Sequence, residues 1–384
     1  MNRSAKVEPL AGKQVVSLAQ QFPGPFATML LADLGADVVI VEAPERGDPA
    51  RTEPAFWEAL NRGKRALAVD LKSARGREAL LRVIEGTDVL LEGFRPGVVQ
   101  RLGVDYDVVR ARRPSITYVS ISGFGQDGRD SHRPNHDILF LALSGMLEPF
   151  VRHGVPQLAQ DLSLEVADLF AGVFAVIASL VGLSSMPPGG YFDVSMSDSL
   201  TYMLSGRLGP ALNGVPPRYV NPDAAYRLFE TSDDRWLALG VAGYEDHFWR
   251  RLCESVGLPE LAGCTSEDRA ERSVDLQRQL ASVIRGRSLD AWIRILGAAD
   301  VPHAPVLTST EAVDSHQLGD RGMIALGSAG LRYVESPFRR KVPRTEELSP
   351  APLLGQDTRK LLQAAGLSAA DIEDLIASGA ASEP

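Results

Sequence analysis

Cysteine is scarce in this sequence, and its scarcity excludes two ways of stabilising a fold. Only Cys253 and Cys264 occur among the 384 residues, which is too few for a disulfide framework. Neither cysteine has neighbours at metal-ligand spacing, so we expect no bound metal. A chain with so few cysteines fits a reducing compartment, and we expect the protein to be cytoplasmic.

Long apolar runs and an excess of positive charge are also lacking. The most apolar stretch, residues 162–186, is interrupted by Glu165 and Asp168, so it does not predict a membrane span. The first ten residues are polar and lack the apolar run of a signal peptide. A formal net charge of −9 argues against a nucleic-acid-binding protein, because such proteins normally carry net or clustered positive charge. We therefore expect neither a membrane nor a nucleic acid as a partner.

Strands and helices alternate in the first third of the chain. Residues 14–18 and 38–42 have the composition of buried strands, and residues 26–34 between them have helical apolar spacing. A strand, a helix and a strand in this order predict a right-handed crossover and a parallel sheet. The alternation continues through predicted strands at 66–69, 88–91 and 116–121 and predicted helices at 74–84 and 98–102. We therefore predict an α/β fold with a Rossmann-like parallel sheet.

The remainder of the chain divides near residues 210–222, where proline, glycine and asparagine cluster. Before this cluster, strongly apolar helices are predicted at 138–147 and 162–183. A second region follows, with a strand predicted at 236–241 and helices at 247–256, 276–284 and 289–298. A last helix, 358–365, is expected to close the chain before a short Ala/Ser tail.

Two side chains suggest proton-transfer chemistry. His136 and Asp168 each lie beside apolar residues, and an imidazole and a carboxylate brought to opposite faces of one carbon form an acid/base pair. Asp168 is flanked by Ala167 and Leu169, so its charge must be paired, desolvated or functional. The alternative for His136 is a hydrogen-bonded residue at a helix start, with Asp137 as a capping or surface residue.

Six segments along the chain carry recognisable motifs: Gly24 to Val39, Asn61 to Arg65, Gly93 to Val98, Ser122 to Gln126, Val301 to Val306 and Leu354 to Asp357. In this order they resemble the class III coenzyme A transferases (CaiB/BaiF type), a superfamily that also contains α-methylacyl-CoA racemases. The resemblance implies a Rossmann-like large domain, residues 1–216 with 331–384, and a smaller α+β domain, residues 217–330. It also implies an interlocked homodimer with the active site between subunits.

The branch within this superfamily depends on the residues around the acid/base pair. His136-Asp137-Ile138 resembles the racemase branch, whose members place their catalytic histidine there. Asp168, however, lies in Ala-Asp-Leu-Phe-Ala-Gly, which is closer to the transferases than the Gly-Asp-Phe-Gly-Gly-Gly typical of racemases. Glu245 lies where the racemases have a glutamate that orients the histidine. The resemblance thus implies His136, Asp168 and Glu245 as catalytic residues.

Three hypotheses follow from the resemblance. The first is an α-methylacyl-CoA racemase or epimerase, in which 1,1-proton transfer inverts the α-carbon of a 2-methylacyl-CoA. Its enolate oxygen needs a donor, which we expect to be a backbone N–H at the start of the helix near Asp168. The second is a CoA transferase, in which Asp168 is a nucleophile that forms an aspartyl-CoA thioester. The third is a non-catalytic CoA-binding protein.

All three hypotheses imply an acyl-CoA ligand, with coenzyme A as part of the substrate and no permanently bound cofactor. The CoA phosphates require cations in loops at strand ends. The predicted CoA-binding residues are Asn61, Arg62, Lys64, Arg65, Lys72 and Arg95. The alternative for the charged members is solvated surface charge.

Overall fold

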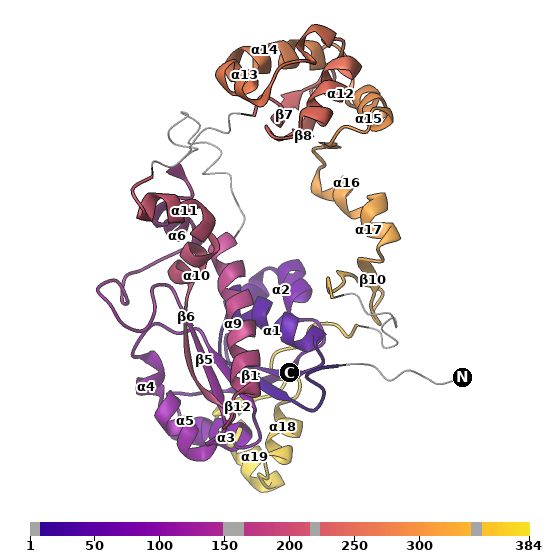
Figure 1. The fold of residues 1–384 in the computed structure, drawn as a ribbon. Coiled ribbons are helices and arrows are strands. Elements are labelled where there is room, and N and C mark those ends of the chain that lie inside the picture. Colours follow the sequence, from indigo (N-terminus) through magenta and orange to yellow (C-terminus); the bar gives the residue numbers. More distant parts are fainter. Residues whose placement is uncertain (1–7, 149–164, 216–222, 339–347) are drawn as a thin grey trace. The chain divides into compact units, whose positions relative to one another are not determined.

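In the computed structural model, the described residues are 8–148, 165–215, 223–338 and 348–384. The chain forms two compact units, Met1–Val215 with Gly322–Pro384, and Pro216–Arg321, and each is described by itself (Figure 1). The chain thus returns to the first unit at residue 322, earlier than the predicted residue 331. The predicted boundary at 216 and the first residues of the predicted helix 162–183 lie outside the described residues.

The first unit is built on a seven-stranded sheet with the order β12-β3-β2-β1-β4-β5-β6. Its strands are β1 (Gln14–Ser17), β2 (Asp37–Glu42), β3 (Arg65–Val69), β4 (Val89–Glu92), β5 (Thr117–Ser122), β6 (Gly190–Ser195) and β12 (Ala381–Ser382). Strands β1 to β6 are all parallel, and their order reverses direction between β1 and β4, as in Rossmann folds. The predicted α/β fold with a Rossmann-like parallel sheet is confirmed.

Helices cover both faces of this sheet. The helices of the first unit are α1 (Pro23–Asp33), α2 (Pro54–Asn61), α3 (Ala74–Ile84), α4 (Val98–Leu102), α5 (Tyr106–Arg112), α6 (Asp137–Leu143), α9 (Val166–Ser184), α10 (Met196–Met203), α11 (Ser205–Leu212), α18 (Thr358–Ala364) and α19 (Ala369–Ala377), with the short 3-10 helix η1 (Pro49–Thr52). Alternate strand residues point to opposite faces. Val16 and Leu90 belong to the core under α3, α18 and α19, whereas Val15 and Leu91 belong to the core under α1 and α9.

Helix α9 is long and apolar enough to cross a membrane by length and composition, yet here it is a core helix. Its buried residues Ala171 and Ala175 pack in the core it shares with α1 and the sheet (Figure 1). A Cβ added at Gly172 would lie 2.8 Å from Phe26 Cδ1, so a glycine is required where the two helices meet. Its N-terminal turn carries Asp168, and this packing therefore fixes the position of that carboxylate.

The end of the chain corrects one expectation. The prediction that the helix at residues 358–365 is the last element before an Ala/Ser tail was wrong, because α19 and β12 follow α18. Ser368 and Asp371 form a reciprocal capping box at the start of α19, which satisfies otherwise unpaired helix N–H groups. Strand β12 then pairs antiparallel with β3 through Ala381 and Ser382.

The second unit combines a small antiparallel sheet with helices. Its elements are β7 (Tyr226–Glu230), β8 (Trp236–Gly240), α12 (Asp246–Val256), η2 (Pro259–Leu261), α13 (Ser266–Glu271), α14 (Ser273–Ile284), α15 (Leu289–Ala298), β9 (His303–Pro305), α16 (Ser309–Val313) and α17 (His316–Asp320). Trp249 and Trp292 are fully buried in its core. In the first unit, β10 (Ile324–Leu326) and β11 (Arg332–Val334) form a separate hairpin.

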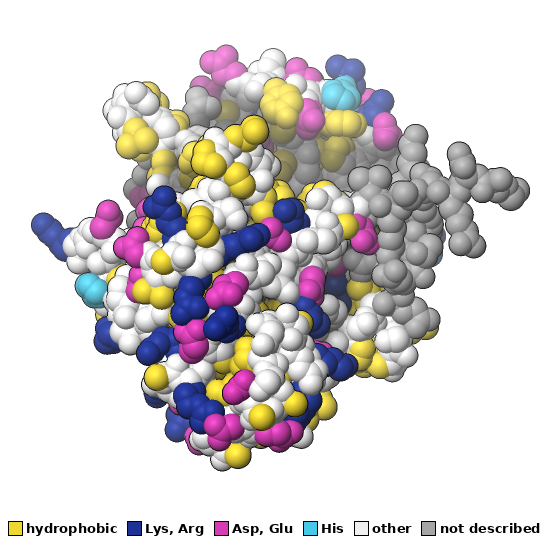
Figure 2. Space-filling view, turned by 90° about the horizontal axis from the view of Figure 1, so that it is seen from below, with side chains coloured by type: hydrophobic (Ala, Val, Ile, Leu, Met, Phe, Trp, Pro, Cys, Tyr) yellow, Lys and Arg dark blue, Asp and Glu magenta, His cyan; other side chains and the backbone are white. Residues whose placement is uncertain are grey.

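Charges of both signs are mixed on the surface. Over the described residues of the face in Figure 2, Lys and Arg side chains lie among Asp and Glu side chains. Ion pairs also join elements of the first unit: Arg112 pairs with Glu78 and Glu85, and Arg359 with Glu373. Exposed pairs of this kind contribute little to stability, because water and salt screen them. Their main consequence here is that many of the arginines already have acidic partners.

Candidate active site

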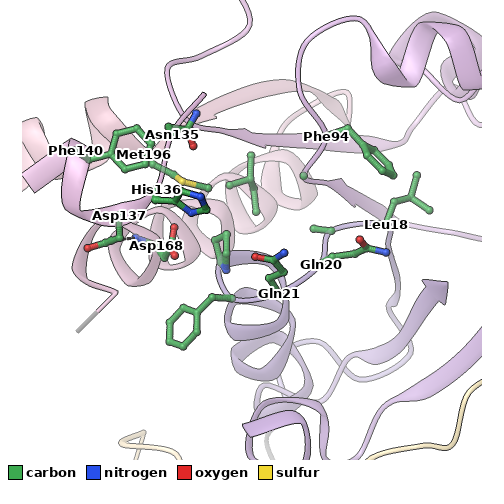
Figure 3. Close-up of a pocket in the computed structure, with 15 residues that line it drawn as sticks. Leu18, Gln20, Gln21, Phe94, Asn135, His136, Asp137, Phe140, Asp168 and Met196 are labelled. Carbon is green, nitrogen blue, oxygen red and sulfur yellow. Dashed lines mark hydrogen bonds between the residues drawn. The ribbon is translucent and has the colours of Figure 1, made fainter. Parts of the chain in front are cut away.

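A cavity of about 260 Å³ lies at the carboxyl ends of the central strands. Residues 18–23 enter it directly after β1, Gly93 and Phe94 directly after β4, and Met196 directly after β6 (Figure 3). This is the point at which the strand order reverses, where open α/β sheets place their ligands. The complete lining is Leu18, Ala19, Gln20, Gln21, Phe22, Pro23, Gly93, Phe94, Ile121, Asn135, His136, Asp137, Phe140, Asp168 and Met196.

The small residues Ala19 and Gly93 allow the loops after β1 and β4 to pack closely against each other at the cavity. A Cβ added at Gly24 would lie 2.2 Å from Ala19 Cβ, and one added at Gly93 would lie 3.1 Å from the same atom. The first distance is too short for any side chain, so Gly24 is required by packing. The glycine in the Pro-Gly-Pro sequence therefore shapes the cavity by close packing of its loop.

Asp168 lies in the first turn of α9 and lines the cavity. Burial raises the pKa of Asp168 to about 7, and the negative charges of Asp137 and Glu165 add to the shift. No positive charge among the described residues opposes it. A carboxyl group with a pKa near neutrality is present in both protonation states at pH 7, so it is suited to give or take a proton.

Asp137 caps α9 and not its own helix. Its Oδ1 accepts hydrogen bonds from the backbone N–H groups of Ala167, at 2.7 Å, and Asp168, at 3.1 Å. These are N–H groups that the helix itself leaves without partners. Asp137 thereby ties Asp168 to the segment that carries His136. We expected a backbone N–H at the start of α9 to stabilise the enolate oxygen. The structure corrects this expectation, because the Asp137 carboxylate already accepts the N–H groups of Ala167 and Asp168.

His136 precedes α6 and brings its imidazole into the same cavity. Its backbone is extended, with φ −146° and ψ 163°, and its side chain does not cap the helix. Figure 3 shows the imidazole and the Asp168 carboxylate lining the same part of the cavity. The preceding Asn135 packs against the end of β5, since a Cβ added at Gly123 would lie 2.1 Å from its Nδ2. The sheet and α9 thus bring together two side chains that are distant in sequence.

Three of the predicted CoA-binding residues are buried and already have protein partners. Arg62 forms two hydrogen bonds with Asp33, at 2.9 and 3.0 Å. Lys64 Nζ lies 2.8–2.9 Å from acceptors on Pro25, Thr28 and Asn61, and burial lowers the pKa of Lys64 well below its usual value. Direct contact between a phosphate and Arg62 or Lys64 would require these bonds to be exchanged. In this structure Arg62 and Lys64 connect the loop after α2 to α1 through these hydrogen bonds.

The other predicted cations are more accessible. Arg65 is half-buried and pairs with Asp37, whereas Lys72 and Arg95 are exposed. Arg95 directly follows Phe94 of the cavity lining. Glu245 belongs to the second unit, where its Oε2 accepts a hydrogen bond from the Ala242 N–H at 2.9 Å. Its action on His136 stays a prediction.

Comparison with known proteins identifies the family. The model of CoA-transferase family III matches residues 10–358, most of the chain. The protein belongs to CoA-transferase family III. The superfamily inferred from the sequence is therefore confirmed, and with it the expectation of an enzyme of this class.

The relatives of this family III protein include both CoA-transferases and α-methylacyl-CoA racemases. An acetyl-CoA:oxalate CoA-transferase from Acetobacter aceti is 31% identical, with 86% of this chain and 89% of the relative covered. The human α-methylacyl-CoA racemase is also 31% identical, with 95% and 96% covered. A CaiB/BaiF family protein from Brucella suis has a TM-score of 0.79 at 27% identity, with 93% and 99% covered.

The sequence alone did not reveal several other cavity residues of this family III member. Gln20, Gln21 and Phe22 follow β1, and Met196 enters from α10. The signal for the first group was present, because residues after the first strand of a Rossmann-like sheet lie at the ligand edge. The position of Met196 depends on how α10 packs, which no local pattern indicates.

Proposed function

We propose that the protein is an acyl-CoA racemase or epimerase that inverts the α-carbon of a 2-methylacyl-CoA. One observation carries the proposal: His136 and Asp168 line one cavity, and the pKa of Asp168 is raised to about 7. Family members use CoA as a substrate, and the human racemase matches nearly the whole chain.

The reaction requires two groups because a single base returns the proton to the face from which it came. In one direction, Asp168 removes the α-proton. The C–H electron pair forms the C=C bond of an enolate, and the π pair of the thioester carbonyl moves to its oxygen. His136 then gives a proton to the opposite face, and the enolate electrons form the new C–H bond. Each group contributes about 10²- to 10⁴-fold to the rate. Solvent restores both protonation states, so the reaction consumes no co-reactant.

Solvent deuterium tests this proposal directly. The purified protein, given one 2-methylacyl-CoA in D₂O and no acceptor acid, is expected to incorporate deuterium at the α-carbon. No incorporation across a panel of branched acyl-CoAs would contradict racemisation. The panel also identifies which acyl chain the cavity accepts.

A CoA transferase is the second candidate, favoured by the transferase relative and by the sequence around Asp168. Here the Asp168 carboxylate attacks the donor thioester and expels CoA thiolate, which then attacks the mixed anhydride to give an aspartyl-CoA thioester. The donor acid is released in this step. The acceptor carboxylate then attacks the aspartyl-CoA thioester and expels CoA thiolate, which attacks the acceptor acyl group of the new mixed anhydride to give the product acyl-CoA and the free Asp168 carboxylate. Hydroxylamine or borohydride would trap the covalent species, and such an adduct would replace the racemase proposal with this one.

Arg95 is the cation that we propose for a CoA phosphate, because it is exposed and adjoins the cavity at Phe94. Arg95→Ala is expected to raise KM for acyl-CoA about 10- to 100-fold, since a hydrogen bond to a charged group contributes about 1.5–3 kcal/mol. We expect kcat to stay within about twofold of wild type, because the phosphate is remote from the reacting carbon. Steady-state kinetics measures both values.

Arg112→Ala is the matched control for Arg95. It removes an exposed arginine that pairs with Glu78 and Glu85. Arg112 is the last residue of α5 and lies just before the start of β5, so it is at the amino ends of the strands, whereas the cavity is at their carboxyl ends. Its KM is expected to equal that of wild type. An unchanged KM in Arg95→Ala would assign the phosphate contact to other cations, with Lys72 the next to be replaced.

We further propose that a second copy of the chain covers α9. Val173, Ile177 and Val181 repeat every four residues along one face of α9 and are 40%, 46% and 49% exposed. Such a stripe on a core helix is typical of an interaction surface, and the resemblance to interlocked dimers supports a second copy of the chain as the partner. The cytoplasmic location likewise stays our proposal.

Ile177→Glu tests this assembly. Wild type is expected to have twice the chain mass of 41.4 kDa by light scattering, and the variant the mass of one chain, because a buried unpaired carboxylate opposes association. Val108→Glu, at an exposed residue on α5, should remain dimeric. A monomeric wild-type protein would contradict the proposal.

A further inference from the structure

A hydrogen-bond donor for the thioester oxygen is still missing from the site. Asp137 takes the N–H groups of Ala167 and Asp168, and Leu169 N–H donates to the Glu165 carbonyl. The side-chain carboxamide of Gln21 can supply the hydrogen-bond donor that the start of α9 does not supply. Its carboxamide points into the cavity in Figure 3, and among the described residues it has no hydrogen-bond partner. A carboxamide N–H is a strong donor.

We propose that the Gln21 carboxamide donates a hydrogen bond to the thioester oxygen, and that Asp48 positions Gln21 to do so. The inference rests on the proposed function, because it names a further residue of the same site. It applies to either reaction: an enolate oxygen in racemisation and a tetrahedral oxyanion in transfer both need such a donor.

The backbone of Gln21 is held in an uncommon conformation. Its φ is +64°, in the left-handed region, which glycine, asparagine and aspartate enter far more readily than glutamine. A residue persists in this region only where its surroundings impose it, and such residues concentrate at functional sites. The conformation sets the direction in which the Gln21 side chain leaves the loop.

Asp48 is the group that imposes this conformation. Its two carboxylate oxygens lie 3.2 and 3.0 Å from the Gln21 nitrogen and accept its N–H. The same carboxylate caps η1 by accepting the Ala50 N–H at 2.8 Å. Asp48 is buried, and burial raises its pKa while the bonds from Ala50 and Gln21 oppose the shift. A buried carboxylate is costly, and here it joins Gln21 to the loop after β2.

That loop is itself firmly held. The Asp48 N–H donates to Glu42 Oε1 at 2.8 Å, and Glu42 is the last residue of β2. The Arg51 guanidinium donates a hydrogen bond to each carboxylate oxygen of Glu42, both at 2.7 Å, and its Cζ lies 3.9 Å from the centre of the Trp57 ring. Rigid support of this kind is what an oxyanion donor needs, because a donor that must reorganise contributes little to catalysis.

Gln21→Met tests the donor, since methionine has similar length and no N–H. We expect kcat to fall about 10²- to 10³-fold, the usual loss of one oxyanion donor, and KM to change less than about threefold. Gln100→Met, at an exposed residue of α4, is the matched control and should match wild type. A kcat within about fivefold of wild type in Gln21→Met would overturn the proposal.

Asp48→Asn tests the positioning. Asparagine still accepts the Ala50 N–H, but its amide then presents an N–H group to the Gln21 N–H. We expect kcat to fall about tenfold in the wild-type background and less than about twofold in the Gln21→Met background, because the donor is already gone there. Equal losses in both backgrounds would overturn the positioning role. Asp105→Asn, which alters the cap of α5, is the control.

Hydrogen exchange tests the same contact without relying on turnover. In a peptide containing Gln21, Asp48→Asn should speed amide exchange about tenfold or more, whereas Asp105→Asn should not. Unchanged exchange would overturn the Asp48 contact. A wild-type protein that catalyses neither racemisation nor transfer would refute the proposed function, and the exchange result would then still decide the role of Asp48.

Discussion

Asp168→Asn is expected to lower kcat by about 10²- to 10⁴-fold, because the amide neither takes nor gives the α-proton. The substitution keeps the size of the side chain and removes a charge that nothing nearby neutralises. We expect KM for acyl-CoA to change little, since the binding of CoA does not depend on this group. Steady-state kinetics with both enantiomers of the substrate measures the effect.

The same variant is expected to be more stable than wild type at pH 8. The pKa of Asp168 is raised to about 7 by burial, so the native state binds more protons than the unfolded state between the ordinary carboxyl pKa and about pH 7. Stability therefore falls as pH rises through this window, and asparagine removes the penalty. A thermal midpoint that decreases at pH 8 would indicate that Asp168 supports the fold.

Asp168 also predicts a pH dependence that is the same in both directions of racemisation. Each direction needs one proton shared between Asp168 and His136, and inversion takes up no net proton, so the ratio of kcat/KM in the two directions does not change with pH. Because the pKa of Asp168 is about 7, we expect both values of kcat/KM to change in parallel as pH passes through this value. Asp290→Asn, at an exposed first-turn position of α15, should leave both profiles unchanged.

His136→Gln is expected to abolish racemisation to a similar extent, about 10²- to 10⁴-fold. Glutamine occupies a comparable volume but does not exchange a proton near pH 7. In a transferase, by contrast, His136 would be dispensable, because Asp168 alone forms the covalent intermediate. Parallel assays of racemisation and of CoA transfer therefore separate the two functions.

His132→Gln is the matched control for this experiment, because His132 is exposed, precedes His136 in the same loop and lies outside the cavity lining. It should retain wild-type rates in both assays. If His136→Gln kept full racemase activity, the imidazole would not be one of the two proton-transfer groups. The group that transfers a proton on the face of the substrate opposite Asp168 would then have to be another residue.

The Rossmann-like sheet was predictable because it depends on local patterns. Continuous apolar runs such as residues 38–42 are typical of strands buried on both faces, and the helices between them follow from apolar spacing. Strand β6 was missed because half-buried and exposed residues alternate along its first four positions, so it lacks a continuous apolar run. Strand β12 was missed because its small residues become a strand only by pairing with β3. Helix α19 was missed because its apolar residues Ile372 and Leu375 gain stability from the tertiary core.

The acid/base pair was predictable, but its surroundings were not. His136 and Asp168 stood out as polar groups in apolar sequence, and the structure places both in one cavity. The roles of Asp137 and Asp48 depend on contacts with residues 30 and 27 positions away, which no periodicity indicates. The cluster of basic residues after α2 suggested phosphate binding, and only the structure shows that Arg62 and Lys64 form hydrogen bonds with α1.

The most direct test of two-sided proton transfer is deuterium exchange on single enantiomers of one 2-methylacyl-CoA. We predict that wild type exchanges and racemises both enantiomers. His136→Gln should exchange only the enantiomer whose α-proton faces Asp168, and Asp168→Asn only the other, each without inversion. Exchange of the same enantiomer by both variants, or full racemisation by either, would contradict the account.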